Sequence, residues 1–509
     1  MSASNIAQQS TPPGPAQSRK GRHASPARAR RSALSVALQI ALVILVTAGT
    51  LVSGFSFVDG DKTLAVLPVI AMVAVGLGLL ALTPFSAFVI LLLAVRPALD
   101  LFKLSSNATG TAVGNTATQR GLDPSSIVGV LFLLAAALWL AGRIRSGQLV
   151  PGSRLRTAML AFLAACALSV VGSVQPQASA LELLRIGTVV MMFVVLEQII
   201  TSRTVMIRVL VTCYVAMLIP LGFTLFGIVT GSPSSEVRGS FTRLTGPFNQ
   251  SNTFARYLAF LLVFGIAIYP YVKPKLKLLF VAMLGLASVF MLLTLTRTAI
   301  LGSVAGLVVL AVVQKRKGLI GGLVAIALCA LMVLPGVAAR FGTLDAESTP
   351  QGAPTGNTLV WRLHYWTEVI PLANANPVTG IGLASTQYET DAAKQPHNDF
   401  IRAYVETGLV GLVFYVCMLV ALVGNARRAV QRAPRDTLES GVAAGALACA
   451  VCFVLGSMAA NVMSNVVSLW YLIAFAAAAG YVSRTFAPGA DSSGLQSRPD
   501  AGVVSAGKA

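Results

Sequence analysis

The stretch KQPHNDFIRAYVETGLVGLVFYVCMLVALVG, Lys394–Gly424, passes from a polar loop into a long apolar run. After Glu406 the run carries no charge, and it is long enough to cross ~30 Å of hydrocarbon as a helix. Its first turns nevertheless contain a histidine, an aspartate, an arginine and a glutamate, and charges are costly where a chain enters lipid. The stretch therefore predicts a membrane helix with a polar site at its start.

The whole chain shows the same apolar character. It has 509 residues, of which 55% are hydrophobic and 11% charged, which is too apolar for a soluble globular protein. We predict an all-α, polytopic helical membrane protein with about 12–14 spans and one large periplasmic loop that contains short helices. The candidate spans are 33–56, 64–82, 84–95, 125–142, 157–174, 179–200, 208–230, 252–271, 278–296, 298–314, 318–336, 399–424, 438–460 and 464–483, of which 84–95 is short enough to be re-entrant or interfacial.

These spans divide the chain into five regions. The two ends are rich in Ser, Pro, Gly and Ala, which is typical of disordered segments. The regions are a basic cytoplasmic tail at 1–32, a first membrane region at 33–336, a large extracytoplasmic loop at 337–398, C-terminal membrane helices at 399–484 and a second cytoplasmic tail at 485–509.

The positive charge is distributed as membrane topology requires. With the N-terminus in the cytoplasm, most of the 38 Lys and Arg residues fall in the tails and in the inner turns. We therefore interpret the net charge of +20 as a topology signal and expect no nucleic-acid partner. The first apolar run is over-long for a cleaved signal peptide, so we expect it to be retained as a signal anchor.

The cysteines and glycines of the spans indicate packing. All six cysteines fall inside apolar runs, so we expect no disulfides, and we interpret the CxxC of Cys449 and Cys452 as small packing residues. Gly302 with Gly306 forms a GxxxG pattern that indicates helix packing.

Several arginines are not explained by topology, because they lie near the predicted outer boundary. Arginine suits phosphate, since its planar fork donates two parallel hydrogen bonds, and several such residues in one leaflet predict an anion site. The alternative is that each arginine snorkels or pairs with Glu182, Asp399 or Glu406. The residues concerned are Arg96, Arg185, Arg243, Arg256, Arg297, Arg362 and Arg402.

The large loop contains a second set of candidates. Residues 357–370, NTLVWRLHYWTEVI, place Leu359, Leu363, Trp366 and Ile370 on one stripe and predict an amphipathic helix on the membrane surface. After it, Gly380 and Gly382 would let backbone approach a ligand closely. Near neutral pH His397 could take a proton from a hydroxyl nucleophile, although it could also be a structural residue of a capping turn.

Four stretches together resemble the O-antigen ligase and polymerase superfamily of bacterial membrane glycosyltransferases. They are HNDFIRAYVETGLVGLVFY (397–415), WRLHYWTEVIPLANANPVTGIG (361–382), RLTGPFNQSNTFARYLA (243–259) and TLTRTAILG (294–302), with RPALD (96–100) as a weaker match. The third stretch differs from the family in having Asn249-Gln250 before Ser251-Asn252, where members often carry His or Glu with Pro.

The resemblance implies a GT-C-like fold and an enzyme of the inner membrane with its active site facing outward. Members transfer a glycan from an undecaprenyl-diphosphate carrier to the hydroxyl of a lipid-linked or glycan acceptor, in polysaccharide, lipopolysaccharide or exopolysaccharide biosynthesis. Because the donor bond is already activated, no cofactor and no metal are implied, and the sequence contains no P-loop or dinucleotide fingerprint.

The resemblance also assigns roles to residues. His397, Arg243 and Arg362 would be catalytic, with His397 the base or orienter of the acceptor hydroxyl. The implied substrate-binding residues are Arg185, Arg256, Arg297, Asn252, Asn398, Asp399, Arg402, Glu406, Gly380 and Gly382.

Two alternatives stay open. A polysaccharide repeat-unit polymerase would use the same donor site, and we favour the ligase only because the His-Asn stretch follows one large outer loop. A flippase for lipid-linked oligosaccharides would also have many spans. It would require polar groups through the full depth of the membrane, and this sequence shows no repeat of one half of the chain in the other.

Overall fold

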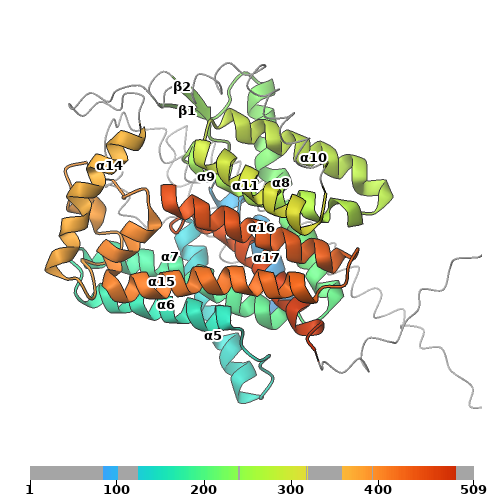
Figure 1. The fold of residues 1–509 in the computed structure, drawn as a ribbon, viewed down its shortest axis with the longest axis horizontal. Coiled ribbons are helices and arrows are strands. Elements are labelled where there is room, and N and C mark those ends of the chain that lie inside the picture. Colours follow the sequence, from blue (N-terminus) through green and yellow to red (C-terminus); the bar gives the residue numbers. More distant parts are fainter. Residues whose placement is uncertain are drawn as a thin grey trace, which may run out of the picture. The chain divides into compact units, whose positions relative to one another are not determined.

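The structure is a computed structural model that describes residues 84–100, 124–238, 241–316, 318, 358–392 and 394–488. Within them, nine helices are long and apolar enough to cross a membrane, so the predicted all-α, multi-pass membrane fold is confirmed (Figure 1). The α-helices are α3 (Phe85–Val95), α5 (Pro124–Arg145), α6 (Arg154–Val171), α7 (Pro176–Ile199), α8 (Arg203–Val229), α9 (Ser251–Ile268), α10 (Pro274–Leu293), α11 (Arg297–Val313), α14 (Thr358–Val369), α15 (Asp399–Arg432), α16 (Leu438–Ala459) and α17 (Val466–Thr485). Short 3-10 turns are η1 (Ala98–Asp100), η3 (Tyr269–Tyr271), η4 (Ile370–Ala375) and η5 (Thr386–Tyr388).

Each predicted span within the described residues corresponds to one helix, while 33–56, 64–82 and 318–336 lie outside them. The largest difference is α15, which continues past the predicted end at 424 to Arg432. Its extra turns bury Asn425, whose amide donates to the Ala476 carbonyl at 2.9 Å, while its arginines can extend toward water. Helix α3 is about 16 Å long at about 1.5 Å per residue, too short to cross the membrane by itself.

Helix α17 lies at the centre of the bundle and packs against α7, α8, α9, α15 and α16 (Figure 1). Most of its side chains are buried, and residues 474–480 read AFAAAAG. Helices in lipid associate through close packing rather than through a hydrophobic driving force, and small side chains permit that approach. The one large ring of this run, Phe475, stacks on Phe264 of α9 with centroids 3.8 Å apart.

Helices α11 and α16 form a second close contact. The Cys452 thiol donates to the Gly302 carbonyl of α11 at 2.7 Å, while the Cys449 thiol of the same helix donates to the Phe260 carbonyl of α9 at 3.3 Å. A Cβ on Gly306 would lie 3.2 Å from the Ala448 carbonyl oxygen. The interpretation of the CxxC and GxxxG patterns as packing is therefore confirmed.

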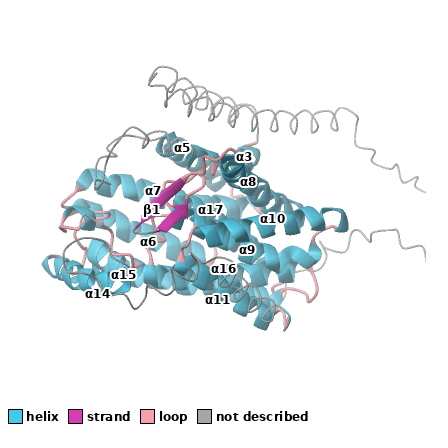
Figure 2. Cartoon of the chain, turned by 90° about the horizontal axis from the view of Figure 1, so that it is seen from above, coloured by secondary structure: helices cyan, strands magenta, loops and turns pink. Residues whose placement is uncertain are grey.

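A small antiparallel hairpin was not predicted from the sequence. It consists of β1 (Ser235–Arg238) and β2 (Phe241–Leu244) and joins α8 to α9 (Figure 2, magenta). Its register places Glu236 opposite Arg243, and their side chains form an ion pair of 3.4 Å. The hairpin is too short for an alternating apolar pattern to reveal it.

Helix α15 has a break at Gly408 (φ 66°, ψ −169°), and the loop before it repairs the interrupted hydrogen bonding. The N–H groups of Ile381 and Gly382 donate to the carbonyls of Val405 and Glu406, both at 3.0 Å. The two backbones approach so closely that a Cβ on Gly380 (φ +72°) would lie 2.5 Å from the Glu406 carbonyl carbon.

Alanine at Gly380 should therefore destabilise the fold by about 1–3 kcal/mol, because it strains the backbone and collides with α15. The measurement is unfolding of the purified protein in detergent. Gly285→Ala in α10 is the matched control, since an added Cβ there meets no atom within 4 Å. Equal stability of the two variants would contradict this account of the loop.

Candidate functional site

The linker between α16 and α17, residues 460–465, is where polar side chains from several helices meet. Arg256 of α9 donates to the Asn461 carbonyl at 3.0 Å, and the Asp399 carboxylate accepts from the N–H groups of Val462 and Met463, both at 3.0 Å. Just before the linker, Arg362 of α14 donates to the Ala459 carbonyl at 2.8 Å. Residues as far apart as 205 positions are thus brought to one short turn.

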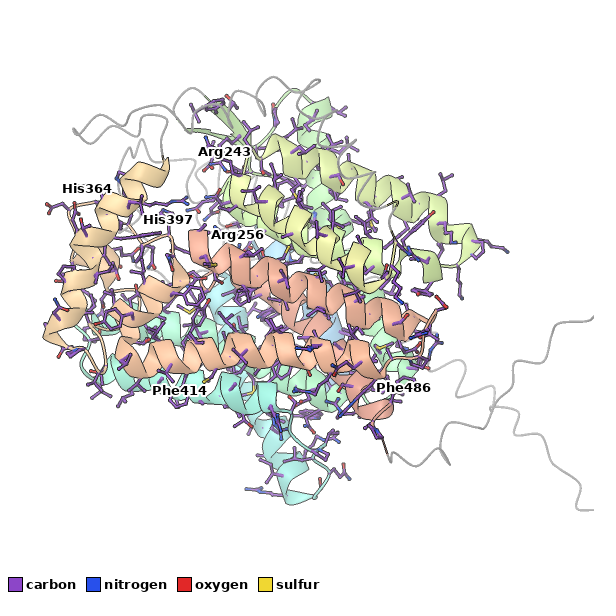
Figure 3. All side chains as sticks on the ribbon, in the orientation of Figure 1. Arg243, Arg256, His364, His397, Phe414 and Phe486 are labelled. Carbon is purple, nitrogen blue, oxygen red and sulfur yellow. The ribbon has the colours of Figure 1, made fainter. Side chains whose placement is uncertain are left out.

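His397 lies beside the same linker. Its Nδ1 is 3.3 Å from Nδ2 of Asn461, and the ring of Trp361 meets its ring edge-on with centroids 6.2 Å apart. The next residue, Asn398, caps α15 by accepting from the N–H groups of Phe400 and Ile401 at 2.9 and 3.2 Å. In Figure 3, His397 and Arg256 lie close together between α14 and α9.

Helix α14 holds the turn that contains His397. The Trp366 indole donates to the Pro396 carbonyl at 2.7 Å, the Tyr365 hydroxyl donates to the Lys394 carbonyl, and the Lys394 ammonium lies 4.9 Å from the centre of the Trp361 ring. Burial raises the pKa of Tyr365, which keeps its hydroxyl protonated as a donor. The helix was predicted, and these aromatic residues face protein.

The predicted apolar stripe of α14 is divided between two environments. Leu363 and Ile370 are exposed, whereas Trp366 is half-buried against the turn that contains His397. The exposed part of the stripe suits the expected position on a membrane surface, which remains a prediction. His364 and Glu368 pair at 3.5 Å on the solvent side of this helix.

Arg402 is the centre of a buried ion-pair network. Its side chain is fully buried, and it donates to Glu406 from Nε and to Glu182 from Nη2, both at 2.9 Å. Its remaining Nη1 bonds to Ser464, which also donates to Glu182 at 3.0 Å. The sequence placed Arg402 among the substrate-binding residues. In the structure its guanidinium nitrogens instead form hydrogen bonds to protein side chains.

Three other residues predicted to bind substrate, Glu406, Gly380 and Gly382, likewise contact other parts of the protein. Glu406 accepts from the Ala384 N–H at 2.8 Å and from the Thr386 hydroxyl at 3.0 Å. At Gly380 and Gly382 the close neighbour is protein rather than open space, since a Cβ on Gly382 would lie 2.0 Å from Ser173 Oγ. The expectation that these glycines let a ligand approach is therefore corrected. Their missing side chains let the loop at 380–382 pack against α15 and Ser173.

Arg243 fixes the hairpin to the starts of α9 and α11. It is buried and donates to the Thr294 carbonyl at 2.9 Å, to Asn252 Oδ1 at 2.8 Å and to the Thr296 hydroxyl at 2.8 Å. Arg297, the first residue of α11, is half-buried nearby in the chain. The third and fourth stretches of the resemblance, 243–259 and 294–302, are thus joined into one structural unit.

A cavity of about 360 Å³ opens beside the linker. Among the residues that the structure describes, three arginines line it, Arg96, Arg185 and Arg256, together with one acidic residue, Asp100. Other lining residues are Val128, Gly129, Leu181, Leu184, Thr188, Phe248, Asn249, Gln250, Gln395, Asn461, Ser464, Asn465 and Trp470. The lining of the cavity therefore combines cationic and hydrogen-bonding side chains with apolar ones.

The three arginines differ in how they are held. Arg96 bonds to Asp100 at 3.2 Å and lies 5.6 Å from the centre of the Trp470 ring. The side chain of Arg185 is 46% exposed and bonds to Glu182 at 3.3 Å. Of the seven arginines predicted to form an anion site, Arg96, Arg185 and Arg256 line this cavity, and His397 contacts the lining residue Asn461.

The basic turns lie at the other ends of the same helices. Arg156 and Arg484 both contact Glu197 at 3.5 Å, and Arg203 contacts Glu439 at 2.6 Å. Glu197 is near the end of α7, whereas the cavity touches its first half. Phe486, just after α17, is correspondingly far from His397 in Figure 3. The site and the basic turns therefore occupy opposite ends of the bundle, as the charge pattern predicts.

Residues 282–416 match the O-antigen ligase family. The matched segment runs from α10 into α15 and contains Arg297, Arg362 and His397, so the resemblance to the O-antigen ligase and polymerase superfamily is confirmed. The protein is thus a multi-pass membrane protein with a segment of a family of glycosyltransferase-like ligases and polymerases. No curated protein is detectably similar to the chain. The linker and all three cavity arginines, Arg96, Arg185 and Arg256, lie outside the matched segment.

Proposed function

We propose that this O-antigen ligase-family protein transfers a glycan from an undecaprenyl-diphosphate carrier to an acceptor hydroxyl at the outer face of the bacterial inner membrane, with both termini in the cytoplasm. The observation that carries the proposal is the cavity lined by Arg96, Arg185 and Arg256, with His397 attached to its edge through Asn461. A lipid diphosphate is both anionic and apolar, and the arginines and the apolar residues of the cavity lining match those two properties.

The reaction follows from this arrangement. The acceptor oxygen attacks the anomeric carbon of the donor sugar, the bond from that carbon to the phosphate oxygen breaks, and the diphosphate leaves with the electron pair. The arginines stabilise the charge that develops on the leaving group. His397 accepts the proton that the acceptor hydroxyl loses. Because the donor bond is already activated, the proposal needs no nucleotide, and the guanidinium groups take the role of neutralising the diphosphate.

The buried residues receive supporting roles. Arg402, Glu182 and Glu406 hold the start of α15 in place, and Arg243 holds the hairpin over the starts of α9 and α11. Arg362 and Asp399 fix the linker from either side. We assign donor contact to Arg96, Arg185 and Arg256. Arg96 belongs to the arginines predicted to form an anion site, although the resemblance assigned no role to it.

The decisive experiment supplies the purified protein with an undecaprenyl-diphosphate glycan and identifies the product by mass spectrometry. Transfer to a lipid acceptor would support the ligase, which we favour, and joined repeat units would identify a polymerase. The absence of any glycosidic product with every acceptor would refute the proposed transfer.

Arg256→Gln should weaken donor binding. A lost charge-assisted hydrogen bond contributes about 1.5–3 kcal/mol, so we expect the KM for the lipid-diphosphate donor to rise about 10–100-fold. Arg208→Gln, an exposed arginine on α8, is the control and should leave the KM unchanged. An unchanged donor KM in Arg256→Gln would remove this residue from the site.

A further inference from the structure

The Asn461 side chain lies next to His397 and influences which of its ring nitrogens carries the proton. His397 adopts φ 56°, in the left-handed region that residues with a Cβ rarely use, so its place is imposed by its surroundings. Its Nδ1 lies 3.3 Å from the amide of Asn461. A neutral imidazole carries its proton on one nitrogen, and the group that bonds to Nδ1 selects which one.

The Asn461 amide can present either of its two ends to the ring. As placed, Nδ2 faces Nδ1, and Oδ1 is buried with no hydrogen-bond partner among the described residues. The oxygen and nitrogen of an amide have nearly the same shape, so the reverse orientation occupies the same space. In that orientation Oδ1 accepts from Nδ1–H, and Nε2 becomes the unprotonated nitrogen that can take a proton.

We propose that Asn461 is a positioning residue that holds His397 in the Nδ1–H tautomer and so makes Nε2 the proton acceptor for the acceptor hydroxyl. This inference rests on the proposed function and deepens it. It assigns a role to a residue outside the segment that matches the family, on the linker between α16 and α17.

Asn461 also contacts an arginine of the cavity lining. The Asn461 carbonyl accepts from Arg256 at 3.0 Å, and Asn461 itself lines the cavity. One residue therefore contacts both the proton acceptor and a cation of the donor site. This places the base and the leaving-group site in fixed relation to each other.

Four charged side chains of the described structure lie around the linker and the turn that contains His397. They are Arg256 on α9, Arg362 on α14, Lys394 in the preceding loop and Asp399 at the start of α15. None of them differs between the Asn461 variants described next, so their effect cancels in the comparison.

The test compares Asn461→Ala with Asn461→Asp in purified protein, using an undecaprenyl-diphosphate glycan as donor. Alanine should lower kcat about 10–100-fold with the donor KM nearly unchanged, because the base is misoriented and the donor site is intact. Aspartate keeps an acceptor for Nδ1–H and should retain more activity than alanine. Its charge stabilises the imidazolium, so the acidic limb of the pH–rate profile should move up by about one pH unit.

Asn425→Ala is the matched control, because it removes a buried amide that packs α15 against α17 far from the cavity. It should lower stability without moving the pH profile. Equal losses in both Asn461 variants with an unmoved pH profile, or full activity in Asn461→Ala, would overturn the inference while leaving the proposed transfer intact.

A second readout does not need turnover. Nitrogen-15 NMR of histidine-labelled protein, which has three histidines, reports which ring nitrogen of His397 carries the proton. The wild type should show the Nδ1–H form, and Asn461→Ala should lose it. A wild-type ring protonated on Nε2 would overturn the tautomer assignment, whereas an inactive wild type with the expected tautomer would count against the transfer reaction.

Discussion

Replacing His397 by alanine should reduce glycan transfer by about 10²–10⁴-fold, the range contributed by a positioned general base. The variant should still insert and unfold like the wild type, because the capping of α15 depends on Asn398 and the contacts of α14 run through Tyr365 and Trp366. The measurement is the single-turnover rate with saturating lipid-diphosphate donor, which separates the chemical step from donor binding.

His364→Ala is the control for this variant. His364 lies on α14, its side chain is 77% exposed, and it pairs with Glu368 rather than facing the linker. It should transfer glycan at the wild-type rate. If His397→Ala retained transfer within about threefold of wild type, the base would have to be another group, since the loss of a general base costs more than that.

The helices were predictable from the sequence because the constraint that creates them is local. A backbone in lipid must satisfy its own hydrogen bonds, so every long apolar run in the described residues became a helix with ends near the expected positions. The same locality explains the miss at β1 and β2, whose pairing depends on the opposed Glu236 and Arg243 rather than on a repeated pattern. The break at Gly408 was also missed, because it requires the loop at 376–382 to replace helical hydrogen bonds.

The site was only partly predictable, because its assembly is long-range. The sequence indicated which arginines lie near one end of the bundle, but not which of them face open space. Arg402 pairs with Glu182, 220 residues away, so no local pattern reveals that its donors are occupied. The linker was missed for a different reason, since Asn461 and Ser464 look like ordinary turn residues between two apolar runs. The polar character of that turn was the available signal.

Arg402→Met should cost about 3–5 kcal/mol of folding free energy, which is enough to prevent stable accumulation of many membrane proteins. The substitution keeps the volume of the side chain but removes the cation between Glu182 and Glu406. Glu406 then loses its ion-pair partner, and Glu182 keeps only the half-exposed Arg185. The measurement is unfolding in mixed micelles, read by tryptophan fluorescence and by the amount of folded protein recovered from the membrane.

Two comparisons separate structural pairing from substrate binding. Arg432→Met changes an arginine of the same helix that donates to the Ser483 carbonyl at the opposite end, and it should cost far less. Adding Glu182→Gln to Arg402→Met should recover part of the loss, because it removes one uncompensated charge. If Arg402→Met folded with wild-type stability and instead lost donor affinity, the Arg402 guanidinium would bind the substrate. The structural role that we assign to its ion pairs would then be wrong.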